Sequence, residues 1–124
     1  MPIIKKVRGQ IVPAEIRSDE HCPMVDFVNL ISGKWAIPIL YRLIVIDKPI
    51  RFNDLQRAVT PITQKELTRQ LRLFELRGLV CRTIYAEVPP RVEYEVTELG
   101  KTLRVTLDSL ASWMRINGAR LVRE

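Results

Sequence analysis

The chain has 124 residues, of which 47% are apolar, and it carries a net charge of +6 with an isoelectric point near 9.7. This length and composition indicate one globular domain, and the basic balance favours an anionic partner, nucleic acid before a membrane surface. No apolar run approaches the roughly 20 residues of a membrane-spanning helix, and there is no secretion signal, so we expect a cytoplasmic protein that does not bind membranes.

The beginning of the chain is predicted to differ from the rest. We expect residues 1–21 to form an N-terminal arm and residues 22–124 to form the folded domain. The arm contains Lys5, Lys6 and Arg8, which could touch nucleic acid. The alternative is a mobile, solvated tail, because chain ends are poorly ordered unless other contacts hold them.

Two helices are predicted to open the domain. Pro23 is typical of the first turn of a helix, and Gly33 ends that helix. A second helix follows over residues 34–45. Trp35 on its apolar side is expected to belong to the core, and Pro38 near its first turn could delay the start of the helix or bend it.

The stretch 51–80 predicts two helices joined by a tight turn. Pro61 cannot continue the first helix, and Thr63 is a good N-cap for the second. Gly78 suits the position just after the second helix, and Leu79 then returns to the core. The predicted buried stripe of the second helix consists of Leu67, Leu71 and Phe74.

The opposite side of the second helix is polar and basic. It carries Gln64, Lys65, Thr68, Arg69 and Arg72. These side chains include types that read bases and types that bind phosphates. A short helix, a tight turn and a longer basic amphipathic helix indicate a DNA-binding helix-turn-helix. The alternative is a solvated helix pair in an α-helical bundle.

After Gly78 the apolar period changes from 3.6 to 2. Two alternating runs flank a tip at residues 86–90 that contains Pro89 and Pro90, which predicts a β-hairpin. Arg91 lies at the base of this tip. A hairpin directly after a recognition helix is a wing. The alternating residues are Val80, Arg82, Ile84, Val92, Tyr94 and Val96.

A single helix capped by Thr97 is predicted to run to about Arg115. Trp113 adds apolar surface to it and is expected to belong to the core. Because the preceding helices already supply a core, a long apolar stripe here suggests a partner helix from a second copy. The alternative is packing against its own domain. The stripe consists of Leu99, Leu103, Leu107, Leu110 and Met114.

The predicted fold is therefore mainly α with a small β-hairpin, a winged helix-turn-helix with added N-terminal and long C-terminal dimerisation helices. The chain resembles the HxlR-type bacterial transcriptional regulators, which are related in architecture to the MarR-type proteins. The resemblance covers about residues 22–115. It is carried by Cys22-Pro23, Gly33-Lys34-Trp35, Arg51-Phe52-Asn53-Asp54-Leu55, Ile62-Thr63-Gln64-Lys65, Leu67-Thr68, Leu71, Gly78-Leu79-Val80, Arg82, the string from Tyr85 to Tyr94, and Leu99-Gly100.

This resemblance implies a homodimer whose recognition helices enter successive major grooves of a pseudo-palindromic operator, about 34 Å apart. The dimer interface would include Leu103, Leu107, Leu110 and Met114. The resemblance places Gln64, Lys65, Thr68 and Arg69 at bases and nearby phosphates. It gives Arg72 and Arg91 phosphate contacts, with Lys34 and Arg51 as weaker candidates.

The sequence departs from the family pattern at Leu73 and Leu76, where polar or acidic residues are common. We expect both leucines to lie beside the buried stripe of the second helix and to widen it. They would then touch a neighbouring element or the dimer partner.

Cys22 is a hypothetical sensor. It precedes a helix N-terminus, which favours the thiolate, and some regulators of the resembled family sense oxidants or electrophiles at this place. The alternative is a small structural residue at the helix start, since Asp19 and Glu20 disfavour the thiolate. Cys81 is expected to be a structural strand residue.

No residue pattern predicts an enzyme, a metal site or a cofactor. One histidine and two distant cysteines cannot supply a structural zinc site, and there is no phosphate-binding glycine loop. A small-molecule pocket between the DNA-binding domain and the dimerisation helices is a further hypothesis. The alternative function is a winged-helix protein-interaction module without DNA binding, which would more often carry apolar or acidic residues on the exposed helix face.

Overall fold

A computed structural model describes residues 22–122. The predicted arm, residues 1–21 with Lys5, Lys6 and Arg8, lies outside the described residues, and so do Asp19 and Glu20. The chain divides into two units between Gly33 and Lys34. Each unit is described by itself.

The described part of the first unit contains the helix α1 (Pro23–Leu30). Cys22 is its N-cap residue and Pro23 its first residue, where the missing N–H of proline costs no hydrogen bond. The helix ends three residues before Gly33, and the Ile31 amide still donates to the Phe27 carbonyl at 2.8 Å. Gly33 has a φ of +104°, which allows the chain to turn where other residues are strained.

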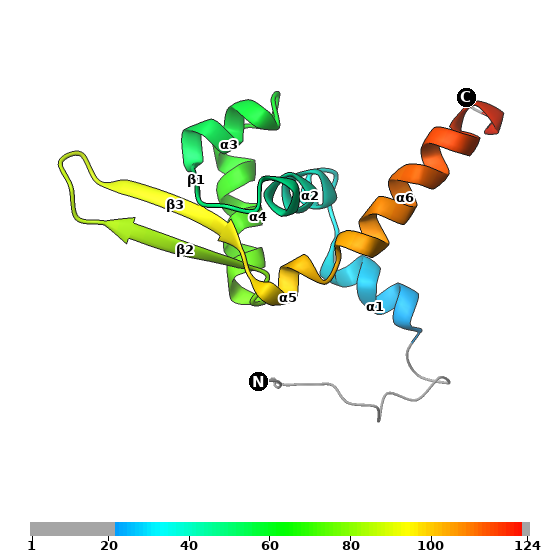
Figure 1. Ribbon diagram of the computed structural model, residues 1–124, viewed down its shortest axis with the longest axis horizontal. Coiled ribbons are helices and arrows are strands. Elements are labelled where there is room, and N and C mark those ends of the chain that lie inside the picture. The colour runs from blue at the N-terminus through cyan, green and yellow to red at the C-terminus, as the bar shows by residue number, and fades with distance from the viewer. Residues whose placement is uncertain (1–21, 123–124) are drawn as a thin grey trace. The chain divides into compact units, whose positions relative to one another are not determined.

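All other elements belong to the second unit (Figure 1). In chain order they are α2 (Ala36–Ile46), β1 (Ile50–Arg51), α3 (Phe52–Ala58), α4 (Gln64–Leu76), β2 (Val80–Tyr85), β3 (Arg91–Val96), α5 (Glu98–Lys101), α6 (Arg104–Asn117) and a 3-10 turn, η1 (Gly118–Arg120). The strands form one antiparallel sheet in the order β1-β3-β2. The predicted fold class, a mainly helical winged helix-turn-helix, is confirmed.

The core of this unit forms where α2 and α4 meet the base of the hairpin. Pro38 is the third residue of α2, so it neither delays nor interrupts the helix, because the first amides of a helix have no partner within it. Trp35 precedes α2 and is half-buried rather than fully in the core. The fully buried residues include Ile39, Leu40, Leu43, Leu55, Leu67, Leu71, Phe74 and Val80.

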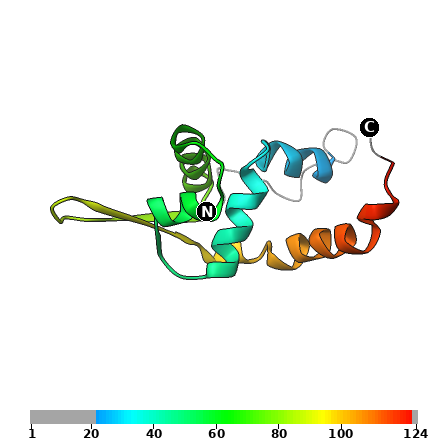
Figure 2. The ribbon, with the colours of Figure 1, turned by 90° about the horizontal axis from the view of Figure 1, so that it is seen from above.

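The hairpin forms the wing as predicted. Its ladder runs from the pair Val80–Val96 to the pair Tyr85–Arg91. The inner pair is buried, whereas Ile84 near the tip is exposed. Figures 1 and 2 show the hairpin extending away from the helices, while α6 extends in the opposite direction.

The sheet has a third strand that the sequence did not predict. In β1, Ile50 pairs with Tyr94 and Arg51 pairs with Glu93. A strand of two residues is too short to show an alternating pattern. It stands directly before α3, so Arg51 ends a strand instead of beginning a helix, and the Phe52 ring lies 6.3 Å from the ring of Tyr94.

The prediction of one C-terminal helix from Thr97 to about Arg115 is wrong. Thr97 does cap a helix, but that helix, α5, ends at Lys101. The amides of Thr102 and Leu103 then donate to carbonyls three residues back, at 3.1 Å each, which tightens the turn in the manner of a 3-10 helix. The Thr102 hydroxyl also donates to the Leu99 carbonyl at 2.6 Å. α6 therefore starts as a separate helix and runs to Asn117.

A compact junction joins the end of α4 to α5. The Leu79 amide donates to the Phe74 carbonyl at 2.9 Å, and Gly78, with a φ of +79°, donates to Glu75 at 3.1 Å, which closes the helix as a Schellman motif. The Thr97 hydroxyl donates to the Gly78 carbonyl at 2.6 Å and accepts from the Gly100 amide at 3.1 Å. One threonine thus holds the end of one helix and the start of another.

Gly100 leaves no room for a side chain. A Cβ atom there would lie 2.5 Å from the Leu79 carbonyl oxygen and 2.5 Å from a methyl group of Val96. We expect Gly100→Ala to lower the free energy of unfolding by about 1–3 kcal/mol, because the backbone at Leu79 cannot yield without breaking the junction. Chemical denaturation at equal protein concentration measures this. Thr106→Ala on exposed α6 is the control, and an equal effect for both variants would contradict the steric explanation.

Candidate nucleic-acid interface

The turn between α3 and α4 is fixed by specific hydrogen bonds. The Thr63 hydroxyl accepts from the Glu66 amide at 3.1 Å, as expected of an N-cap. The Gln56 side-chain amide donates to the Ile62 carbonyl at 3.2 Å, and Ile62 itself is buried. Together with Leu67 in the core, these contacts set the position at which α4 begins.

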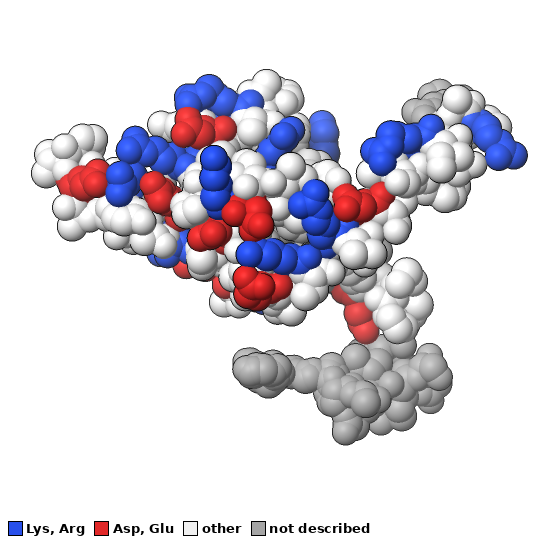
Figure 3. Space-filling view, viewed as in Figure 1, with Lys and Arg blue, Asp and Glu red and all other residues white. Residues whose placement is uncertain are grey.

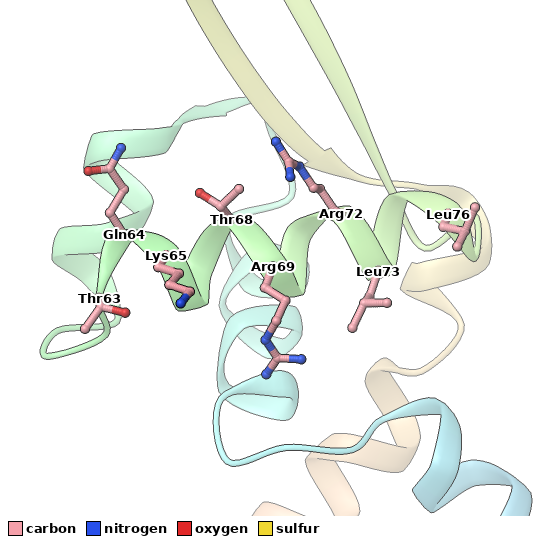
Figure 4. Close-up of a pocket in the computed structure, with 8 residues that line it drawn as sticks. All are labelled: Thr63, Gln64, Lys65, Thr68, Arg69, Arg72, Leu73 and Leu76. Atoms are coloured by element: carbon pink, nitrogen blue, oxygen red, sulfur yellow. The ribbon is translucent and has the colours of Figure 1, made fainter.

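The surface of α4 opposite its buried stripe carries the predicted polar residues in two rows (Figure 4). Gln64, Thr68 and Arg72 project to one side, and Lys65 and Arg69 to the other. Thr68 is half-buried and the other four are exposed. We call these five residues the α4 polar face. The spacing of four residues along each row places successive side chains one helical turn apart.

The three cationic residues of this face, Lys65, Arg69 and Arg72, differ in whether an acidic residue pairs with them. The Arg69 guanidinium pairs with Glu66 one turn earlier, which orients its fork along the helix. Within residues 22–122, Lys65 and Arg72 form no ion pair. Those two charges are therefore available to an anion, while Arg69 must share its donors with Glu66 or leave it.

The expectation that Leu73 and Leu76 widen the buried stripe is wrong for Leu76, which is 82% exposed. Leu76 is nine residues after Leu67, which at 100° per residue places it on the opposite side of the helix. Leu73 is half-buried. Both leucines line the same shallow hollow as the α4 polar face (Figure 4), so they continue that face toward the helix end.

Arg91 is enclosed within the wing. Its guanidinium lies 4.0 Å from the centre of the Tyr85 ring and pairs with Glu87 at 3.2 Å and Glu93 at 3.4 Å. Only 27% of its side chain is exposed. Two carboxylates thus offset its charge locally, and its geometry suits a residue that stiffens the hairpin.

The two weaker candidates lie apart from each other. Lys34 precedes α2 with its ammonium 5.1 Å from the centre of the Trp35 ring. Arg51 lines a hollow between α3 and the wing tip. Asn53 and Arg57, which the sequence reasoning did not select, line the same hollow, and Arg57 pairs with Asp54. Their positions opposite Leu55 on α3 could have indicated this exposure.

Charges elsewhere on the unit are mixed. On the face drawn in Figure 3, basic and acidic groups alternate over the sheet and the neighbouring helices. The outer end of α6 shows basic groups without acidic ones there, since residues 109–122 contain neither Asp nor Glu.

The four predicted dimer residues differ in exposure. Leu107 is only 3% exposed within the single chain, so it can offer little area to a second copy. Leu110 and Met114 are about half exposed, and Leu103 is half-buried. Trp113, expected in the core, is 51% exposed.

Both cysteines are free and exposed, Cys22 at the start of α1 and Cys81 in β2. Between Cys22 and Val122, no three acidic, histidine or cysteine side chains are grouped as a metal site would require. None of the helices in this part of the chain combines the length and the apolarity needed to span a bilayer.

The different settings of Arg72 and Arg91 predict different salt effects on DNA binding. Arg72→Ala should reduce the slope of log affinity against log salt by about one, because each phosphate contact releases about one counterion. Arg91→Ala should reduce the slope by less, since Glu87 and Glu93 already offset its charge. Fluorescence anisotropy across a salt series measures both slopes. Equal reductions would mean that Arg91 leaves its partners to reach a phosphate.

Comparison with known proteins agrees with this geometry. Residues 30–121 match the family described as HxlR-like helix-turn-helix. A curated relative from Methanothermobacter thermautotrophicus, an uncharacterized HTH-type transcriptional regulator, is 42% identical over 106 residues, covering 85% of this chain and 79% of the relative.

Two solved structures are similar as well. One is a protein of Porphyromonas gingivalis W83 assigned to the MarR family of transcriptional regulators, with a TM-score of 0.74, 35% identity, and coverage of 82% of this chain and 97% of that one. The other is the redox regulator HypR in its reduced form, with a TM-score of 0.70, 40% identity, and coverage of 77% and 93%. The chain belongs to the HxlR-like helix-turn-helix family.

Proposed function

We propose that this protein is a sequence-specific DNA-binding transcriptional regulator that acts as a homodimer on a pseudo-palindromic operator. The observation that carries the proposal is the α4 polar face, whose cations are exposed while the opposite side of the same helix is fully buried. A helix held in this way can enter a major groove without exposing its apolar side.

The side chains of the face divide by chemistry. Gln64 can pair with adenine, and Arg69 can make a bidentate contact with the N7 and O6 atoms of guanine. Lys65 and Arg72, which have no ion pair among the described residues, suit phosphates, where position matters more than base identity. Arg51, with Arg57 beside it, would support the same backbone from the hollow between α3 and the wing.

The dimer is proposed to form through α6. Leu110, Trp113 and Met114 expose apolar surface that soluble monomers rarely leave uncovered in a continuous stripe. A two-fold pairing of this surface would duplicate α4 and allow two half-sites about 34 Å apart to be bound together. In Figure 2, α6 extends away from the wing.

A redox response through Cys22 is part of the proposal. The similar protein HypR is a redox regulator, and in this chain the Cys22 thiol is exposed at the N-terminus of α1. An exposed thiol in that position can be oxidised.

We expect Arg69→Ala to weaken binding to the selected operator about 10-fold or more and to weaken binding to random DNA by much less, because one bidentate base contact contributes about 1–3 kcal/mol of discrimination. The matched comparison is Arg57→Ala on α3, which also removes an arginine paired with an acid three residues earlier. Because Arg57 is proposed to lie at the phosphates, this variant should weaken binding to both DNAs equally. Anisotropy titrations on both DNAs measure the effect. Equal loss on operator and random DNA would remove Arg69 from base reading.

We expect hydrogen peroxide, which oxidises one thiol to a sulfenic acid and is itself reduced to water, to change the operator affinity of the wild type at least threefold, and Cys22→Ser to abolish this change. The physical reason is that the Cys22 thiol is exposed to the oxidant. Cys81→Ser, which removes the other exposed thiol, should leave the response intact. A response that survives Cys22→Ser and is lost in Cys81→Ser would assign sensing to the wing strand.

A further inference from the structure

The first helix after the wing is rigidly joined to the DNA-reading part of the protein. The junction of Gly78, Thr97 and Gly100 described above links it to the end of α4. The Lys101 ammonium adds a second attachment, because it pairs with Asp47 at the end of α2 at 3.1 Å and with Glu98 at 3.0 Å. α5 therefore moves with α2 and α4 as one body.

The connection to α6 has a different hydrogen-bond pattern. Thr102 and Leu103 carry the tightened turn between the two helices, so the backbone there does not continue the ladder of α5 into α6. Beyond this turn, Leu107 is the buried side chain of α6 among the described residues, while most residues from Ser109 to Val122 are exposed.

One side-chain hydrogen bond ties this part of α6 to the DNA-reading body. The Tyr41 hydroxyl of α2 donates to Oδ1 of Asp108 on α6. The other carboxylate oxygen of Asp108 lies 3.5 Å from the Arg104 guanidinium within α6. The bond to Asp108 is the largest cause that raises the pKa of Tyr41 above its ordinary value.

Small changes in the direction of α6 would have large consequences for a dimer. Its 14 residues extend roughly 21 Å at 1.5 Å per residue. A tilt of about 10° at one end moves the other end by roughly 4 Å, which is comparable to the 3.4 Å step between base pairs. The direction of α6 therefore determines which half-site separation two copies can span.

We propose that Tyr41 and Asp108 are positioning residues that set the tilt of α6 on the DNA-reading body and thereby the half-site spacing that the dimer accepts. This inference rests on the proposed function, namely a dimer formed through α6 that binds two half-sites. In this proposal neither residue needs to contact DNA. They act through the distance between the two α4 helices.

The test uses the full chain and a set of operators whose half-sites are separated by the preferred spacing, by one base pair more and by one base pair less. Tyr41→Phe keeps the ring and removes the donor. We expect the wild type to prefer one spacing, and Tyr41→Phe to reduce that preference at least threefold, while its affinity for an isolated half-site stays unchanged.

Two further variants separate the hydrogen bond from the charge. Asp108→Asn retains an oxygen acceptor for Tyr41, so it should keep the spacing preference. Arg104→Gln removes the ion pair within α6 but leaves the Tyr41 bond, so it should also keep the preference. Thermal unfolding of each variant shows whether folding is intact.

A second measurement reads the geometry directly. Leu76→Cys, in a background with Cys22→Ser and Cys81→Ser, places a spin label on exposed α4 in each copy. Pulsed electron paramagnetic resonance should show a broader distance distribution when Tyr41→Phe is added. If Tyr41→Phe leaves both the spacing preference and the distance distribution unchanged, the inference is overturned. If the wild type sediments as a monomer or ignores the operator, the proposed function fails instead.

Discussion

The burial of one side of α4 is the constraint on which the rest of the structure depends. Leu67, Leu71 and Phe74 are almost completely removed from solvent, and each such side chain contributes about 1.5–3 kcal/mol when buried. Rotating the helix would expose this stripe, so the α4 polar face has only one outward direction. The residues that could read DNA are oriented by residues that never touch it.

Specific hydrogen bonds also hold both ends of α4. Thr63 satisfies an amide at the start, and Gly78 closes the last turn with a left-handed backbone that other residues adopt only with strain. The same Gly78 carbonyl accepts the Thr97 hydroxyl, so the end of the recognition helix is also the attachment point of α5. The same few backbone groups therefore hold the end of the helix proposed to read DNA and the start of the segment that leads to the proposed dimer helix.

Much of this could be predicted from the sequence, because periodicity and capping residues are local signals. The α4 stripe, the Thr63 cap, the Gly78 stop and the hairpin all follow from spacing. β1 could not be predicted, since two residues show no period. The break at Thr102 was missed because Leu99, Leu103 and Leu107 keep helical spacing across it. The partners of Arg91 depend on which residues face each other across the hairpin, and the burial of Leu107 depends on tertiary packing.

Because β1 pairs with β3 over only two residues, the base of the hairpin is stiffer than its outer part. Near Tyr94 three strands share hydrogen bonds and the ring of Phe52 lies close by, so the base of the wing is stiff. Beyond Glu93 only two strands continue, held by the Tyr85–Arg91 stack. The hairpin can therefore bend about its three-stranded base. A DNA groove that narrows or widens would displace the tip of the hairpin without moving α4.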